Sequence, residues 1–312
     1  MGEAWFGANV DGVISRSVRD TALALDVLAG PEPGDPYVIA PPPAPYVELA
    51  RREPPRLRVA FSTASPIGTP VHAEAVAAVR AAAALLRRLG HDVDEVAPAI
   101  DGAALASDYL YVYFGAAPAV LAWARSQGAR DDEFEPLTRV LGALGEGVSA
   151  GALTTHLMQW NAHARALGAF HQRFDLWLTP TLAGAPIAHG TGDPPPAQVA
   201  VLMALVRTGL LKRLAGSALL RQAIDRIARE NLTHVPFTQL ANPTGVPAMS
   251  VPLHWTADGL PLGVQFVAPF GGEATLLQLA TQLETAQPWF DRLPPIAREA
   301  SMPERPAAAH GR

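Results

Sequence analysis

Hydrophobic positions in the first hundred residues alternate between strand-like runs and a helical spacing. Residues 57–61 form a short apolar run, residues 93–96 begin and end on valine, and both patterns predict strands. Between them, residues 70–89 are rich in alanine, carry apolar side chains on one helical face, and start at a proline, which suits the first turn of a helix. A strand, a helix and a second strand in this order predict an α/β layer architecture.

The same periodicity predicts long helices in the middle of the chain. Residues 103–123 are helical and aromatic, and we expect most of their rings in the core and some in a pocket wall. Residues 153–174 repeat apolar side chains at steps of three, four or seven, which is typical of an amphipathic helix. Residues 199–229 continue as a helix that Gly209 or Gly216 interrupts.

Further strands are predicted in the second half of the chain. Residues 175–180 form a short apolar run that ends at a proline. Residues 245–253 and 260–268 flank Asp258 and Gly259, a dipeptide typical of a tight hairpin turn. Because proline has no N–H to donate, the prolines in the first of these two strands predict irregular pairing.

The ends of the chain carry helix signals and proline-rich segments. Ser17 opens a predicted N-terminal helix with a capping-box pattern, and the proline-rich residues 31–55 predict an extended surface connection. A helix over residues 273–284 follows the hairpin. We therefore expect one partial domain over residues 1–293 and a disordered tail over residues 294–312.

Composition excludes several classes of function. The formal net charge is −5, from 24 basic and 29 acidic residues, so no nucleic-acid partner is expected. The sequence has no cysteine, which excludes disulfides, thiolate metal sites and a cysteine nucleophile. No secretory signal and no run long enough to span a bilayer is readable, so we expect a cytoplasmic protein with no membrane partner.

Three blocks of sequence carry a family resemblance. They are residues 15–31, which begin Ser-Arg-Ser-Val-Arg-Asp-Thr-Ala; residues 174–181, Phe-Asp-Leu-Trp-Leu-Thr-Pro-Thr; and residues 242–265, which begin Asn-Pro-Thr-Gly-Val-Pro-Ala-Met-Ser-Val-Pro. In this order they resemble the amidase-signature family. Residues 134–139 and 287–289 are similar to a branch of that family that includes 6-aminohexanoate cyclic dimer hydrolases.

The resemblance implies an α/β fold with a twisted mixed sheet surrounded by helices, and hydrolysis of amide bonds by a Ser-Ser-Lys triad. In such a triad a neutral lysine withdraws the proton of the nucleophilic serine through a bridging serine, while backbone N–H groups hold the developing oxyanion. No cofactor is implied.

The sequence offers no catalytic residues for this mechanism. In the family the lysine and the glycine-rich serine segment precede the helix that starts at Ser17 here, so the N-terminal part of the fold is expected to be absent. Lys212 is the only lysine and is predicted to be a solvated charge. Ser250 lies in a predicted strand and is assigned a structural role. His156 and His163 lie two turns apart on one predicted helix, so we expect surface or edge roles and no metal site.

Candidate substrate-binding residues remain. By resemblance, the segment around Thr179 and the segment with Asn242, Thr244 and Gly245 lie near the binding cleft of the family. Shaping the turn that leads into the strand is an equally weighted role for Asn242, Thr244 and Gly245. The expected partner is a small-molecule amide substrate, and a homodimer is compatible with the sequence.

Three hypotheses about function follow. The chain belongs to a serine amidase that has lost its N-terminal third and is inactive alone, or it is a non-catalytic remnant or binding subunit that needs a separate chain for the triad. An amidotransferase subunit acting on charged transfer RNA is disfavoured, because the sequence has no basic stripe.

Overall fold

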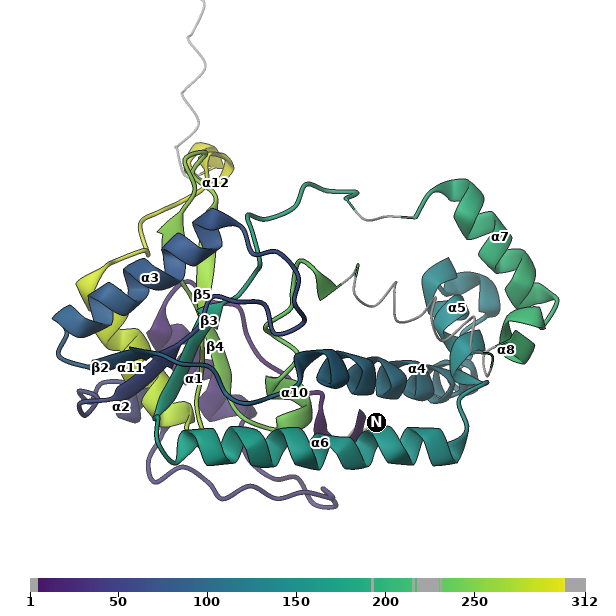
Figure 1. Cartoon of the computed structure of the whole chain (residues 1–312), viewed down its shortest axis with the longest axis horizontal. Helices are drawn as coiled ribbons and strands as arrows, with labels where there is room; N and C mark the ends of the chain where they lie inside the picture. Colours follow the sequence, from purple (N-terminus) through teal and green to yellow (C-terminus); the bar gives the residue numbers. More distant parts are fainter. Residues whose placement is uncertain (1–4, 192–193, 215–216, 218–229, 231, 301–312) are drawn as a thin grey trace, which may run out of the picture.

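The computed structural model describes residues 5–191, 194–214, 217, 230 and 232–300, and its centre is a five-stranded mixed sheet (Figure 1). The strand order is β2-β1-β3-β5-β4. The first three strands run parallel, and β5 and β4 run antiparallel to their neighbours. The strands are β1 (Arg58–Phe61), β2 (Asp92–Glu95), β3 (Leu176–Pro180), β4 (Ala248–Trp255) and β5 (Pro261–Val267).

The predicted strand-helix-strand unit is confirmed. The helix α3 (Ala73–Arg88) connects β1 to the parallel strand β2, as a crossover connection requires. It begins three residues after the proline expected at its start, because the His72 side chain accepts a hydrogen bond from the backbone N–H of Glu74 and caps the helix there. Its buried residues, such as Val79 and Leu86, pack against the sheet.

The predicted hairpin is also confirmed. Strands β4 and β5 pair antiparallel, and Gly259 turns the chain with φ of 80°. The register shifts between Val251 and His254, which flank Pro252. A proline cannot donate to the ladder, so this irregularity follows from the sequence.

Alternation along the strands divides the core into two layers. Val59 and Leu178 face the layer of α3 and α11 (Glu273–Ala286), where the largest apolar cluster forms. Ala60 and Trp177 face the opposite layer, where they pack with residues of α6 (Ala150–His171). The side chains therefore alternate between faces with the period of two expected of a strand.

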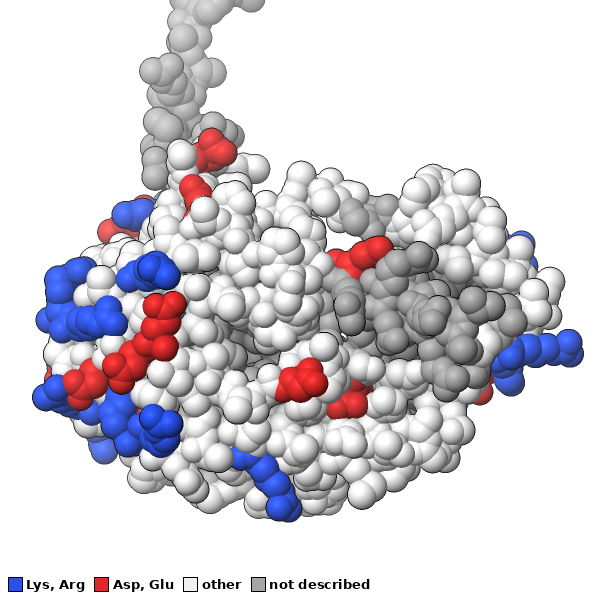
Figure 2. All heavy atoms as spheres, in the orientation of Figure 1, with Lys and Arg blue, Asp and Glu red and all other residues white. Residues whose placement is uncertain are grey.

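Several helices extend the molecule away from the sheet. α4 (Gly102–Ser126) and α6 run side by side from the sheet, and the remaining helices of this region gather at their far end (Figure 1). These are α5 (Pro136–Gly145), α7 (Pro196–Arg207) and α8 (Leu210–Leu214). On the face drawn in Figure 2, basic and acidic side chains gather over the sheet end, and separate acidic side chains lie near the middle of the molecule.

The remaining elements refine the predictions made from the sequence. They are η1 (Trp5–Gly7), α1 (Val18–Leu28), α2 (Tyr46–Leu49), η2 (Asp131–Glu133), α10 (Ala241–Thr244) and α12 (Pro295–Ala300). Gly209, with φ of 68°, separates α7 from α8 as expected, and most of residues 215–229 lie outside the described part of the chain. The stretch predicted as a disordered tail begins with α12, and residues 301–312 lie outside the described residues.

Among the described residues, no helix combines the length and the apolar character that crossing a bilayer requires.

Candidate functional site

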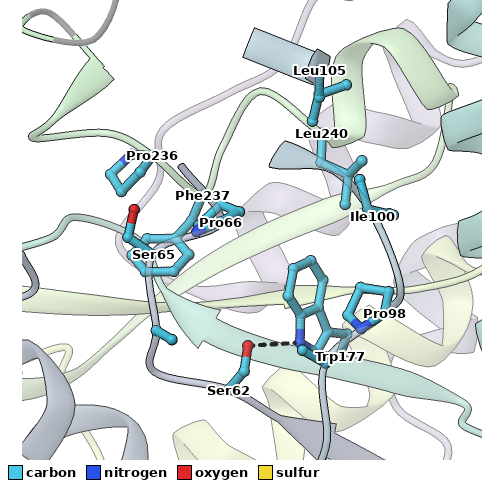
Figure 3. Close-up of a pocket in the computed structure, with 12 residues that line it drawn as sticks. Ser62, Ser65, Pro66, Pro98, Ile100, Leu105, Trp177, Pro236, Phe237 and Leu240 are labelled. Carbon is cyan, nitrogen blue, oxygen red and sulfur yellow. Dashed lines mark hydrogen bonds between the residues drawn. The ribbon is translucent and has the colours of Figure 1, made fainter. Parts of the chain in front are cut away.

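A pocket of about 190 Å³ opens beyond the carboxyl ends of β1 and β2 (Figure 3). Ligands commonly bind at this edge of parallel α/β sheets, because the strands end there and the connecting loops shape the surface. The pocket is lined by Ser62, Ala64, Ser65, Pro66, Ala97, Pro98, Ile100, Leu105, Trp177, Pro236, Phe237 and Leu240.

Several elements that are far apart in sequence build its walls. The loop after β1 contributes the serines, and the segment after β2 contributes Pro98 and Ile100. Trp177 reaches the pocket from β3, and Phe237 and Leu240 close it from the segment that precedes α10. A change in the packing of any of these segments therefore changes the shape of the pocket.

The lining is uncharged and carries few polar atoms. The indole N–H of Trp177 donates a hydrogen bond to Ser62 Oγ at 3.2 Å, as the dashed line in Figure 3 marks. Ser65 Oγ lies 2.8 Å from Thr69 Oγ1, so it already has a hydroxyl partner. No lining residue bears a titratable side chain. This lining suits a neutral, largely apolar ligand, because an ion would lose its hydration without gaining a partner.

Thr179, one of the predicted substrate-binding residues, lies behind the pocket. Its side chain is fully buried and accepts a hydrogen bond from Gln265 Nε2 at 3.3 Å. The same Gln265 nitrogen donates to the backbone carbonyl of Phe237, which lines the pocket, at 3.2 Å. Thr179 and Gln265 are also cross-strand partners in β3 and β5. Thr179 therefore helps to position Phe237 from within the core.

The other three predicted residues form the turn beside the pocket. Thr244 Oγ1 donates to the carbonyl of Leu240, a lining residue, at 2.6 Å. Gly245 ends α10 in the left-handed conformation, with φ of 69°, which glycine adopts without strain. Asn242 donates from Nδ2 to the carbonyl of Ala8 at 2.8 Å, which ties the turn to the N-terminal segment. The hydrogen bonds of Asn242 and Thr244 match the turn-shaping role.

Candidate nucleophiles and bases are held in structural contacts. Ser250 Oγ lies 2.7 Å from Thr181 Oγ1, and these hydroxyls satisfy one another across the sheet. Lys212 Nζ lies 2.8 Å from Glu146 Oε2, and the lysine side chain is 57% exposed. The predicted solvated charge at Lys212 is confirmed. Lys212 is thus engaged by a carboxylate at the protein surface, and it does not line the pocket.

The expectation of surface or edge roles for both histidines is wrong for His163. His156 Nδ1 and His163 Nε2 lie 2.7 and 3.0 Å from the two carboxylate oxygens of Asp108, and Asp108 and His163 are buried. The signal was missed because Asp108 belongs to α4, a different helix from the histidines. No group of metal-ligating side chains that could hold an ion is found within the described residues.

Sequence patterns alone did not identify the pocket lining. The loop with Ser62 and Ser65 and the segment with Phe237 carry no chemical motif, and they meet only through the folding of the sheet. The one available signal was the position of Ser62 directly after an apolar strand, because loops at carboxyl ends of parallel strands frequently bind ligands.

The fold is that of an α/β protein with a pocket at the carboxyl edge of its sheet. The chain belongs to the amidase family, since the family model described as Amidase matches residues 6–220 and 219–277.

Individual relatives agree with this assignment. The chain is 32% identical over 296 residues to the putative amidase AmiB2 of Mycobacterium tuberculosis (strain ATCC 25618 / H37Rv), covering 94% of this chain and 55% of the relative. It is 32% identical over 296 residues to the 6-aminohexanoate-cyclic-dimer hydrolase of Pseudomonas sp. (strain NK87), covering 93% and 56% of the two chains. The chain thus spans about half the length of the curated relatives it matches.

Solved structures support the same family. The structure of 6-aminohexanoate cyclic dimer hydrolase complexed with substrate superposes with a TM-score of 0.72 at 28% identity, covering 90% of this chain and 56% of that one. A bacterial aryl acylamidase shares the fold, with a TM-score of 0.69 at 20% identity and coverage of 94% and 55%. The predicted resemblance and the predicted α/β fold class are confirmed.

Proposed function

We propose that this chain supplies the substrate-pocket part of an amide-bond hydrolase and does not hydrolyse amides by itself. Membership of the amidase family supports the reaction class. The uncharged pocket supports a neutral amide as substrate. In this proposal Thr179, Asn242, Thr244 and Gly245 shape the substrate cleft, with Thr179 acting through Gln265 and Thr244 through Leu240.

The environment of Lys212 is the single observation that carries the proposal. A serine hydroxyl attacks an amide only when a nearby base takes its proton. The Ser-Ser-Lys mechanism that the family resemblance implies uses a lysine next to the serines, and the one lysine of this chain is exposed, contacts Glu146 and does not line the pocket. Arginine cannot replace it, because the guanidinium stays protonated in proteins. In this proposal, the described residues offer no lysine in the position of a proton acceptor for this mechanism.

A second candidate function is a binding subunit that joins a separate polypeptide bearing the lysine and the serines. Two features favour it. Within the described residues, β4 pairs on one side only, so its other edge is open to a further strand. Large apolar side chains are also exposed between residues 10 and 39, among them Val10, Ile14, Val27 and Val38. Apolar surface of this kind is typical of a face that another polypeptide covers.

Amide turnover by the purified chain tests the main proposal. With a neutral aryl amide such as 4-nitroacetanilide, release of nitroaniline should match the blank without protein. Lys212→Ala serves as the matched control, and it should behave as the parent chain does. Turnover above the blank that Lys212→Ala abolishes would show that this lysine is a base and would overturn the proposal.

The physical state of the isolated chain separates the two candidates. If the rest of the hydrolase normally covers the exposed apolar side chains within one polypeptide, the isolated chain should be poorly soluble and self-associate. A monodisperse monomer with a cooperative thermal transition favours the binding subunit, because such a subunit must be stable before it meets its partner.

A further inference from the structure

The size of the pocket limits what it can hold. Drug-sized ligands occupy sites of roughly 300–1,000 Å³. The pocket here has a volume of about 190 Å³. An apolar cavity of about 150 Å³ is large enough for benzene. The pocket therefore has room for one six-membered ring with a short substituent.

The chemistry of the lining limits the ligand further. Apolar side chains such as Ile100, Leu105 and Phe237 surround the space, and Trp177 offers a ring surface (Figure 3). Aromatic rings bind well to such a surface, since stacked or edge-on ring pairs gain stability beyond the burial of area. A charged substituent is excluded, because no lining residue carries a charge to pair with it.

Ser62 supplies one directional polar contact. Its Oγ accepts the indole N–H of Trp177 at 3.2 Å, which fixes the position of the hydroxyl. The hydroxyl can still donate its own proton, and it has no acceptor among the described residues. Ser62 is 8% exposed, so a ligand oxygen that meets this hydroxyl is shielded from water. A carbonyl oxygen is the simplest neutral acceptor for it.

We propose that the pocket binds a neutral molecule with one six-membered ring and a carbonyl group, with the ring against Trp177 and the carbonyl oxygen accepting the hydroxyl proton of Ser62. The assignment of this molecule as the ring-bearing acyl part of a substrate amide rests on the proposed function. The binding itself does not, since it requires no proton acceptor and no bond cleavage.

Acetophenone and ethylbenzene form a matched pair of probes, because they have similar size and differ in the carbonyl group. Binding is followed by the two-dimensional ¹H–¹⁵N NMR signal of the Trp177 indole N–H, assigned by its loss in Trp177→Phe. Acetophenone should shift this signal on titration and bind about threefold to tenfold more tightly than ethylbenzene, as one net hydrogen bond provides. Ser62→Ala should abolish that preference while ethylbenzene still binds.

A pair of variants locates the binding in the pocket. Ala97 lines the pocket and is exposed, so Ala97→Phe fills the space with little effect on folding. Ala99 is exposed two residues away and does not line it, so Ala99→Phe is the control. Ala97→Phe should weaken acetophenone binding about tenfold or more, and Ala99→Phe should leave it unchanged.

Three results would overturn the proposal: no shift of the Trp177 signal with either probe, binding of benzoate as tight as that of acetophenone, or equal effects of Ala97→Phe and Ala99→Phe. Failure here is distinguishable from failure of the proposed function. A chain that hydrolyses amides contradicts the proposed function whether or not it binds the ketone, and a chain that does neither contradicts only the inference about the pocket.

Discussion

Asp108 is a buried carboxylate that accepts hydrogen bonds from two histidines of the neighbouring helix. His156 donates a hydrogen bond to one carboxylate oxygen and His163 donates one to the other, so each oxygen of Asp108 has a partner on α6. A carboxylate only accepts, so each imidazole must present an N–H to it. The ring of Tyr111 stacks on His156 with 4.0 Å between the ring centres. This arrangement ties α4 to α6 and orients the buried side chains of Asp108 and His163.

We predict that Asp108→Asn lowers the free energy of unfolding by about 2 kcal/mol, because the new amide NH₂ faces an imidazole N–H and leaves two donors opposed. The matched control is Asp101→Asn at the start of the same helix. Asp101 accepts the N–H of Ala104 as the N-cap, and asparagine caps equally well, so little change is expected. Urea denaturation measures both, and equal effects of the two variants would contradict this role for Asp108.

His171 provides a test of pH dependence. Burial lowers the pKa of His171 below its ordinary value of 6.5. Its Nδ1–H donates to the carbonyl of Phe174 at 3.1 Å, and its Nε2 is buried with no hydrogen-bond partner within the described residues. The folded protein therefore holds the neutral imidazole, and a proton is bound more readily by the unfolded chain.

The stabilising contribution of neutral His171 is present above the unfolded pKa and is lost as the pH falls toward the folded pKa. We predict that the free energy of unfolding decreases from about pH 7.5 to about pH 5.5, and that His171→Gln reduces this slope. His189→Gln is the control, since His189 lies exposed in a loop. An unchanged slope in His171→Gln would contradict the prediction.

The hydrogen-bond partners of single side chains were the hardest feature to predict from the sequence. Ser17 was expected to cap its helix because its partner lies three residues away, and the structure confirms that its Oγ accepts the N–H of Asp20. The partners of Thr179 and Asp108 lie 86 and as many as 55 residues away, on other elements. Local patterns contain no information about such pairs before the fold is known.

α4 and α5 approach each other closely at Gly145. A Cβ atom built on Gly145 would lie 2.0 Å from the carbonyl oxygen of Phe114 and 2.6 Å from Pro118 Cδ, so the two helix backbones have no room for a side chain there. Gly168, in the exposed part of α6, has no atom within 4 Å of such a Cβ. The two glycines therefore respond differently to the same substitution.

We predict that Gly145→Ala lowers the free energy of unfolding by about 2 kcal/mol, because the backbones must move apart. Gly168→Ala should instead raise it by about 0.5–1 kcal/mol, because alanine is the better helix former and meets no obstacle. Thermal and urea unfolding of the two variants provide the comparison. Stabilisation by Gly145→Ala would show that α5 does not pack on α4 in this way.

Elements with strong periodicity were predicted well. The strands, the hairpin and the helices α3, α4, α6 and α11 lie within a few residues of the expected ranges, since their apolar spacing reflects which face is buried. α2 was missed because prolines surround its four residues and suggest an extended chain. α5 contains two glycines that allow its close approach to α4, and local sequence patterns do not predict this contact.

The whole molecule combines a well-packed sheet with large apolar side chains that remain in solvent. Val10, Ile14 and Val38 are 79%, 106% and 69% exposed. We predict that the isolated chain binds the dye 8-anilinonaphthalene-1-sulfonate and self-associates as its concentration rises. The triple substitution of these residues by serine should weaken both effects. Equal dye binding in the parent and the variant would show that these three side chains do not form the surface that binds the dye.

The fold class and the family could be predicted from three sequence blocks, whereas the pocket could not. Its lining comes from loops after β1 and β2, from β3 and from the segment before α10, and their meeting depends on the order of strands in the sheet. Two of the predicted binding residues are connected to that lining by hydrogen bonds, Thr244 directly to Leu240 and Thr179 through Gln265 to Phe237. The sequence blocks therefore contain residues that lie near the pocket, and they do not contain most of the side chains that line it.

The central claim is that no serine among the described residues has a base to activate it, and intact-protein mass spectrometry after incubation with a reactive fluorophosphonate tests it directly. Such a reagent adds covalently to activated serines and leaves unactivated hydroxyls unchanged. The account predicts that the mass of the chain stays unchanged at neutral pH. A stoichiometric adduct that peptide mapping assigns to a single serine, such as Ser62, Ser65 or Ser250, would contradict it.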